Sequence, residues 1–210
     1  MAKYVGADCR QCRREGCKLF LKGERCLSKK CSFERNSNIP GQHGNGNMRK
    51  RSSEYSIQLR EKQKVKRAYN LLEKQFYAYY VKASKEKGVI TGTAMLSFLE
   101  RRLDNVVYRL GLADSRAQAR QYVNHGMFTL NGKNVDIPSI QVRVGDVIAI
   151  RENKANKPMF KDLREVKFVT PKWLQMDVNS LSGKVIALPE RDDIDLNIKE
   201  NLIIEFYSKN

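Results

Sequence analysis

The sequence predicts an α+β protein, and the spacing of its apolar residues and cysteines carries this prediction. Apolar residues recur at helical spacing between residues 55 and 110. Beyond residue 127 they alternate around Asn131-Gly132, the strongest two-residue signal for a β-hairpin. All five cysteines lie in the first 31 residues, in a segment with little apolar sequence. We therefore expect a cysteine-rich arm, a helical domain, and a small α/β module in which two helices pack on a small antiparallel sheet.

The 210-residue chain is strongly basic, and its charge is unevenly distributed. Its 40 Lys and Arg exceed its 23 Asp and Glu by 17, and residues 1–67 hold 18 of the basic residues but only six of the acidic ones. This excess favours a polyanionic partner, with a membrane surface as the alternative. No apolar run has the length of a spanning helix, and the start, MAKYVGADCR, lacks the apolar core of a signal peptide. We expect a cytosolic protein that does not enter a membrane.

The cysteines follow the spacing C-x2-C-x4-C-x8-C-x4-C. Without a secretion signal, a cluster of this kind is more typical of metal ligands than of disulfides. Cys9 and Cys12 form a pair whose thiolates share one face of a tetrahedron, and Cys26 and Cys31 are the natural second pair. The residues alone leave open which four of the five bind. We expect one structural Zn²⁺, with an iron–sulfur cluster or metal-free cysteines as alternatives.

Helices are expected on both sides of residue 70. A long, basic helix within residues 54–69 places Tyr55, Leu59, Lys62 and Lys66 at helical spacing. Asn70 with Glu73 resembles a capping box for a second helix. We expect the apolar stripe of that second helix to form core, and it comprises Leu72, Phe76, Tyr79, Tyr80 and Ala83. A further helix is expected near residues 99–110, and Gly111 ends it. Its apolar stripe is also expected to form core, and it comprises Leu99, Leu103, Val106, Val107 and Leu110.

The small module follows directly. Ser115 with Gln118 predicts a capped helix that runs through His125. Strands are expected at 128–135, 142–144 and 147–150, and short strands within 167–178 and 183–190. The last segment, residues 197–210, fits either a strand or a helix.

The predicted module helix carries the residues most suited to RNA. Arg116 and Arg120 lie one turn apart, as do Gln121 and His125, and Lys133 follows the hairpin turn. Arginine presents a rigid fork to phosphate oxygens and stacks on exposed bases. We expect both arginines on an exposed face, where the alternative is a face that is merely solvated.

Residues 102–150 closely resemble the RNA-binding module named for the fourth small-subunit ribosomal protein. The module also occurs in pseudouridine synthases, heat-shock RNA-binding proteins and tyrosyl-tRNA synthetases. The rest of the chain is similar to the bacterial ribosomal protein family itself. That similarity lies in KYVG at the start, CRQCRREGCKLFLKGERC, the PGQHG loop at 40–44, SEYSIQLREKQKVKRAY at 53–69 and LIIEFYS at 202–208.

The resemblance implies a domain order and a role. An arm (1–52) precedes a helical domain (53–97) that the tail (190–210) rejoins, and the inserted domain comprises the module (98–160) and a remainder (161–189). The family binds small-subunit ribosomal RNA at a multi-helix junction, enters assembly early, neighbours ribosomal proteins three and five, and in some bacteria represses its own messenger RNA. It also implies Cys9, Cys12, Cys26 and Cys31 as the zinc ligands, with Cys17 an addition.

We therefore expect a structural RNA-binding protein and no catalytic residues. No nucleophile elbow or H-E-x-x-H motif is present, and the glycines form neither a phosphate loop nor a dinucleotide fingerprint. The alternatives are an RNA-modifying enzyme that uses the module to hold its substrate, and a translational regulator that does not reside on the ribosome. The candidate RNA contacts are Gln42, His43, Arg49, Lys50, Arg51, Lys62, Lys66, Arg116, Arg120, Gln121, His125 and Lys133.

Overall fold

The structure is a computed structural model that describes residues 3–42, 44, 52–155, 157–161 and 169–209. The chain divides into two compact units, one of Met1–Met95 with Leu196–Asn210 and one of Leu96–Asp195. The sequence predicted domain boundaries between residues 97 and 98 and between residues 189 and 190, and the observed boundaries differ from these by a few residues. No helix in the described part of the chain is both long and apolar enough to cross a membrane.

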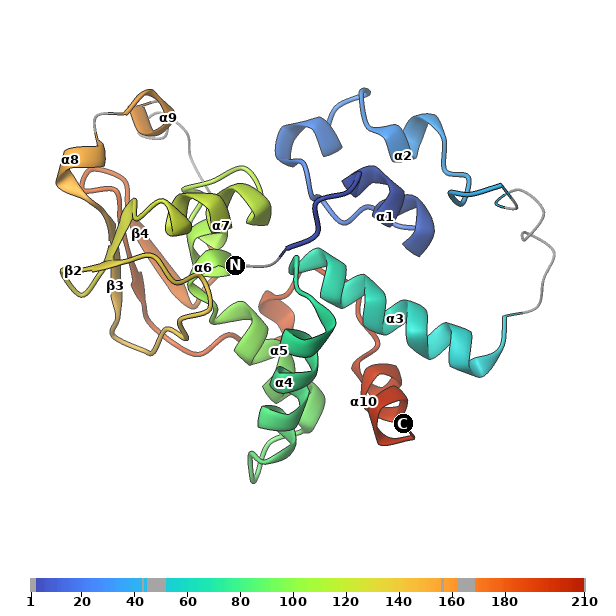
Figure 1. The fold of residues 1–210 in the computed structure, drawn as a ribbon. Coiled ribbons are helices and arrows are strands. Elements are labelled where there is room, and N and C mark those ends of the chain that lie inside the picture. Colours follow the sequence, from blue (N-terminus) through green and yellow to red (C-terminus); the bar gives the residue numbers. More distant parts are fainter. Residues whose placement is uncertain (1–2, 43, 45–51, 156, 162–168, 210) are drawn as a thin grey trace. The chain divides into compact units, whose positions relative to one another are not determined.

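The first unit is helical (Figure 1). The long basic helix is confirmed, and Ser53 caps it by accepting a hydrogen bond at Oγ from the Ser56 N–H (3.3 Å). The tail is a helix, which settles the choice that the sequence left open; it packs on α3 and buries Ile203 and Phe206. The helices of this unit are α1 (Asp8–Glu15), the 3-10 helix η1 (Gly23–Cys26), α2 (Ser32–Arg35), α3 (Glu54–Ala68), α4 (Glu73–Ser84) and α10 (Glu200–Ser208), and α5 (Thr91–Glu100) begins in it.

The expected capping box of Asn70 and Glu73 is wrong. Asn70 has φ 55°, a left-handed conformation that ends α3, and Leu72 caps α4 without a side-chain hydrogen bond. The Glu73 carboxylate instead accepts hydrogen bonds from Lys62, Lys66 and Tyr207, each at 2.7 Å. These donors come from α3 and α10, so the acid that the sequence assigned to a cap joins three helices.

The second unit confirms a mixed fold in which helices accompany a small antiparallel sheet. Its sheet has the order β2-β1-β3-β5-β4 with every neighbouring pair antiparallel. Leu130 pairs with Lys133 across the predicted hairpin, and Asn131 (φ 50°) and Gly132 (φ 78°) adopt the left-handed backbone that this tight turn requires. The elements are α6 (Leu103–Arg109), α7 (Arg116–Asn124), β1 (Phe128–Leu130), β2 (Lys133–Val135), β3 (Val147–Ile150), α8 (Glu152–Ala155), α9 (Pro158–Lys161), β4 (Leu174–Asp177), β5 (Ser182–Val185) and the 3-10 helix η4 (Arg191–Asp193).

The expected continuous helix over residues 99–110 is interrupted. Arg102 is extended (φ −68°, ψ 136°), and it separates α5 from α6. The backbone at the break pairs with residues 140–142, because Leu103 N–H donates to the Ile140 carbonyl and Val142 N–H donates to that of Arg101, both at 2.9 Å. The expected strand at 142–144 is therefore replaced by a single bridge between Arg102 and Gln141.

One apolar core holds the second unit together. Leu103 and Val107 of α6 are fully buried in it, as are Leu110, which follows α6, and Phe128 of β1. The short strands expected beyond residue 167 are present as β4 and β5, and they belong to the same sheet as the hairpin. Helix α7 packs on this core through Ala119 and Val123, and this packing fixes the directions of its polar side chains.

Candidate nucleic-acid interface

The expected exposure of Arg116 and Arg120 is wrong. Only 9% of Arg116 and 1% of Arg120 is exposed. Arg116 Nε donates to Asn105 Oδ1 at 2.7 Å, and its guanidinium carbon lies 4.6 Å from the Tyr108 ring centroid. Arg120 Nη1 lies 3.7 Å from Asp104 Oδ2. Both arginines thus face α6, and in this conformation neither is presented to a phosphate.

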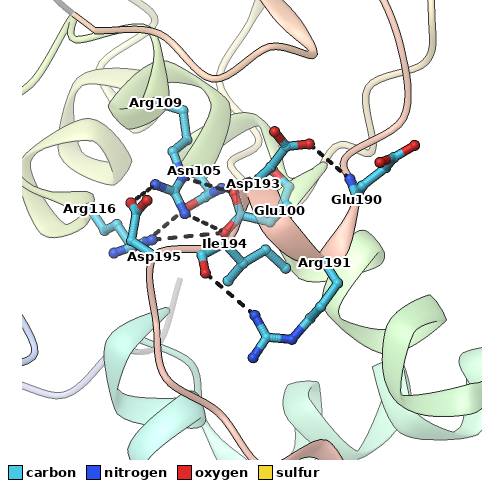
Figure 2. Close-up of polar contacts among 9 residues, drawn as sticks. All are labelled: Glu100, Asn105, Arg109, Arg116, Glu190, Arg191, Asp193, Ile194 and Asp195. Carbon is cyan, nitrogen blue, oxygen red and sulfur yellow. Dashed lines mark hydrogen bonds and ion pairs between the residues drawn. The ribbon is translucent and has the colours of Figure 1, made fainter.

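Glu100 is the centre of one buried charge cluster (Figure 2). Its carboxylate accepts hydrogen bonds from Arg109 Nε (3.0 Å), Arg109 Nη2 (2.9 Å) and Asn105 Nδ2 (2.7 Å), while Arg116 Nη2 lies 4.0 Å away. Figure 2 shows Arg109 and Arg116 directed at this carboxylate, with Asp195, an exposed acid, beside Arg109. A carboxylate with no exposed surface needs such partners, since an unpaired buried charge is strongly unfavourable.

Asp104 forms the second part of this cluster. It accepts hydrogen bonds from Arg102 Nε (3.0 Å) and Nη2 (2.7 Å) and from the Asn105 backbone N–H (2.9 Å). Sequence reasoning missed both acids. The available signal was an acid and an amide, Asp104 and Asn105, inside an otherwise apolar helical stripe, because buried charges predict buried counter-charges.

Three of the predicted RNA contacts of the module lie on its surface. Gln121, His125 and Lys133 are exposed, and none forms a side-chain hydrogen bond with a residue that the structure describes. Arg151, which sequence reasoning did not select, donates from Nη1 to the Gly126 carbonyl at 3.1 Å and so holds the turn next to His125. The predicted RNA contacts of α7 that reach the surface therefore lie at its C-terminal end, and its two arginines are not among them.

In the first unit, Lys62 is also internal rather than presented to solvent. It is 5% exposed, donates to Glu73, and lies 4.5 Å from the Phe206 ring centroid. Burial alone would raise the pKa of Glu73, but hydrogen bonds from Lys62, Lys66 and Tyr207 outweigh it and lower that pKa to about 2. Lys66 is half-buried in the same arrangement.

Helix α1 presents cations that the structure leaves at the surface. Arg10 and Arg14 are exposed and Arg13 is half-buried. Gln42, a predicted contact, lines one shallow surface hollow together with Arg10 and Arg13. The predicted contacts His43, Arg49, Lys50 and Arg51 lie outside the described residues.

A buried acid attaches α1 to α3. Glu15 accepts a hydrogen bond from Arg60 Nη1 at 3.0 Å and another from Arg67. Burial raises the pKa of Glu15, and the charges of Arg60 and Arg67 partly offset that rise. This contact holds the arginine-bearing helix in one position on the unit.

The five cysteine thiols are free and gathered in the arm, and Cys12, Cys26 and Cys31 are buried. Burial raises the pKa of Cys12, and the nearby Cys26, Cys9 and Cys17 add to the rise. The Lys22 N–H points at Cys26 Sγ from 3.4 Å. The donor chemistry suits a thiophilic metal, but no three Cys, His, Asp or Glu side chains in the described ranges are arranged to hold one.

Comparison with known proteins finds matches along the whole chain. Residues 3–100 match the family model described as ribosomal protein S4/S9 N-terminal domain, and residues 101–148 match the S4 domain. The chain is 57% identical to small ribosomal subunit protein uS4 of Heliobacterium modesticaldum and 60% identical to that of Ruminiclostridium cellulolyticum, in each case over 100% of both chains. The protein of the same name from Desulfovibrio desulfuricans is 56% identical, again over both full lengths. Because the likeness extends over the arm, the helical unit and the module alike, the chain belongs to the uS4 family of small ribosomal subunit proteins.

Proposed function

We propose that this chain is a structural constituent of the small ribosomal subunit in the cytoplasm, where it binds small-subunit ribosomal RNA at a multi-helix junction early in assembly. The observation that carries the proposal is the cationic surface of α1, where Arg10 and Arg14 are exposed and form no ion pair with a described residue, in a chain with 17 excess positive charges. Family membership supports the ribosomal setting. No step of this role requires a catalytic residue.

The mechanism is phosphate neutralisation combined with recognition of RNA shape. The buried cluster around Glu100 and Asp104 joins α6 to α7, so that Gln121 and His125 keep their positions before RNA arrives. A rigid site loses little conformational entropy on binding, which favours affinity. Lys133 and Gln42 are the further contacts that we propose among the described residues, and His43, Arg49, Lys50 and Arg51 are proposed from the sequence alone.

Salt dependence tests the mechanism. If binding neutralises about five to ten phosphates, the affinity for protein-free small-subunit ribosomal RNA falls about a thousandfold or more between low and moderate salt. Filter binding across a salt series measures this slope. A nearly salt-independent affinity contradicts the electrostatic mechanism.

A substitution pair tests the module. Gln121→Ala with His125→Ala should weaken binding without lowering the free energy of unfolding, because both side chains are exposed. The matched control is Asn179→Ala with Asn153→Ala, two exposed polar residues elsewhere in the same unit, which should leave affinity unchanged. If both double variants bind the RNA with the same affinity, the C-terminal end of α7 is not part of the interface.

The ribosomal setting is tested separately. We propose ribosomal proteins three and five as neighbours, and the chain's own messenger RNA as a second ligand, on the ground of the family resemblance. Co-sedimentation with small subunits in high salt is expected. Release from subunits at a salt concentration that preserves messenger RNA binding would favour a regulator that does not reside on the ribosome.

We also propose one structural zinc ion in the arm, held by Cys9, Cys12, Cys26 and Cys31. Four thiolates would supply a complete tetrahedron, and metal binding would then be coupled to ordering of the arm. Elemental analysis should find one zinc per chain. Cys17→Ser should keep that stoichiometry, whereas Cys12→Ser should lose it. Iron with sulfide would replace zinc by a cluster, and loss of metal in Cys17→Ser alone would overturn the ligand set.

A further inference from the structure

A surface hollow in the first unit is lined by cations and by no acidic side chain among the described residues. Its walls are the N-terminal segment, α1, and the C-terminal end of α3 with the turn that follows. Arg10 and Arg14 lie one helical turn apart on α1, and neither forms an ion pair or side-chain hydrogen bond with any residue that the structure describes. Lys66 and Arg67 line the opposite wall, although Glu73 and Glu15 already pair with them. The hollow is therefore a positively charged pocket in which two guanidinium groups form no ion pair with a described residue.

The same hollow contains an aromatic ring. Tyr4 lines it and is 43% exposed, so that its ring is available to a ligand. The ring lies against the backbone of Gly6, since a Cβ atom added there would stand 2.4 Å from Tyr4 Oη. The lack of a side chain at Gly6 thus leaves room for the hydroxyl end of Tyr4. An exposed aromatic ring is a platform on which any nucleobase can stack.

Pro40, Asn70, Leu71 and Leu72 also line the hollow, together with two further amides, Gln11 and Gln63. Gln11 is 8% exposed and faces the hollow from α1, and the half-buried Gln63 faces it from α3. An amide offers both donor and acceptor, which matches the edge of a base. Neither amide forms a side-chain hydrogen bond within the described ranges, so both remain available to a ligand.

We propose that this hollow binds one unpaired nucleotide of an RNA, with its phosphate on Arg10 and Arg14 and its base on Tyr4. Cations alone would suit any phosphate, but the aromatic ring and the amides favour a nucleotide over inorganic phosphate. The nucleotide is unpaired because bases inside an A-form helix are not accessible for stacking on a side chain. The inference rests on the proposed function, since it assigns a site to RNA that the chain would bind.

The test compares full-length variants that lose the same charge. Arg10→Ala with Arg14→Ala removes the cations of the hollow. The control, Arg25→Ala with Lys29→Ala, removes two exposed cations of the same arm that do not line this hollow. Against protein-free small-subunit ribosomal RNA at one moderate salt concentration, the hollow variant should lose about tenfold or more in affinity, because charge-assisted contacts to phosphate are the strong ones. The control should lose less than about threefold, the smaller effect expected of a general field.

A second measurement separates stacking from charge. Tyr4→Ala keeps every charge and should still lower affinity about fivefold or more. Base-specific chemical probing of the RNA should find a base that wild-type protein protects and that becomes reactive with both Tyr4→Ala and the hollow variant, but stays protected with the control. Circular dichroism should show all variants folded, since the substituted side chains lie on the surface.

The outcomes are distinct. If wild-type protein binds the RNA and the hollow variant loses no more affinity than the control, or no base regains reactivity with Tyr4→Ala, the nucleotide site is refuted while the proposed function stands. If inorganic phosphate at millimolar concentration displaces the RNA from wild type and control equally but nucleoside monophosphates compete no better, the hollow is a phosphate site and the assignment of a base is wrong. If wild-type protein does not bind the RNA, the proposed function and this inference are both refuted.

Discussion

The buried carboxylate of Glu100 allows a sharp test of the charge cluster. Glu100→Gln keeps the size of the side chain and removes its charge. Glu100 has no exposed surface, and both of its carboxylate oxygens accept hydrogen bonds from Arg109. In the variant, an amide NH₂ replaces one of those oxygens. One N–H of Arg109 then faces another donor, and the charges of Arg109 and Arg116 lose their buried counter-charge.

The expected cost follows from these contacts. Leaving a buried donor without an acceptor costs about 1–3 kcal/mol. Breaking a buried ion pair by removing one partner costs about 3–5 kcal/mol in total, because the other charge stays buried. We therefore expect Glu100→Gln to lower the free energy of unfolding of the second unit by about 3–5 kcal/mol.

The chain offers its own probe and control. Trp173 is the single tryptophan and is 2% exposed within the core of the second unit, so its fluorescence reports urea unfolding of that unit. Asp195→Asn removes the other acid that pairs with Arg109, but the Asp195 side chain is 79% exposed and its loss should cost at most about 1 kcal/mol. Equal, small effects of both substitutions would refute the claim that burial makes the Glu100 pair important.

Four further predictions concern packing, charge and pH. Arg116→Ala with Arg120→Ala should destabilise the second unit by about 3–5 kcal/mol, and weaker RNA binding at an unchanged free energy of unfolding would contradict the observed burial. Leu103→Ala, at a site with no exposure, should cost about 2–5 kcal/mol in the Trp173 transition through lost burial and a cavity. Gly183→Ala should cost about 1–3 kcal/mol, because its Cβ would stand 2.4 Å from Leu110 Cδ1 and Cδ2, and an unchanged urea midpoint would show that Leu110 moves freely. The pKa of Glu73, about 2 against an ordinary 4.5, predicts stability that is complete above about pH 5 and lost as pH falls toward 2. Glu73→Gln should abolish this pH dependence in acid titration of the helical signal, and because the side chain is 45% exposed we expect only about 1 kcal/mol from it.

Local chemistry made several elements predictable. Ser115 caps α7, and Asn131-Gly132 forms the tight turn, because these features depend on residues only a few positions apart. The apolar stripe around Leu103 and Val107 was recognised as core for the same reason. The interruption of that stripe at Arg102 was not recognised, since its cause is a backbone pairing with residues about 40 positions later.

The candidate site shows the same division. The excess of basic residues and their concentration in the first third follow from the sequence by counting, and they predicted a polyanionic partner. Which of the cations remain at the surface could not be counted. Arg116, Arg120 and Lys62 are neutralised inside the protein, while Arg10 and Arg14, which sequence reasoning did not select, remain exposed.

The sequence by itself determined the class of fold, the hairpin, the Ser115 cap of α7 and the sign of the partner's charge, because periodicity, turn chemistry and net charge are local or additive properties. Only the tertiary structure decided which charged side chains are internal. A cation becomes structural when an acid from elsewhere in the chain is buried beside it, as Glu100 is beside Arg109 and Arg116. That pairing depends on how helices pack, and a residue's own neighbours in sequence do not specify it.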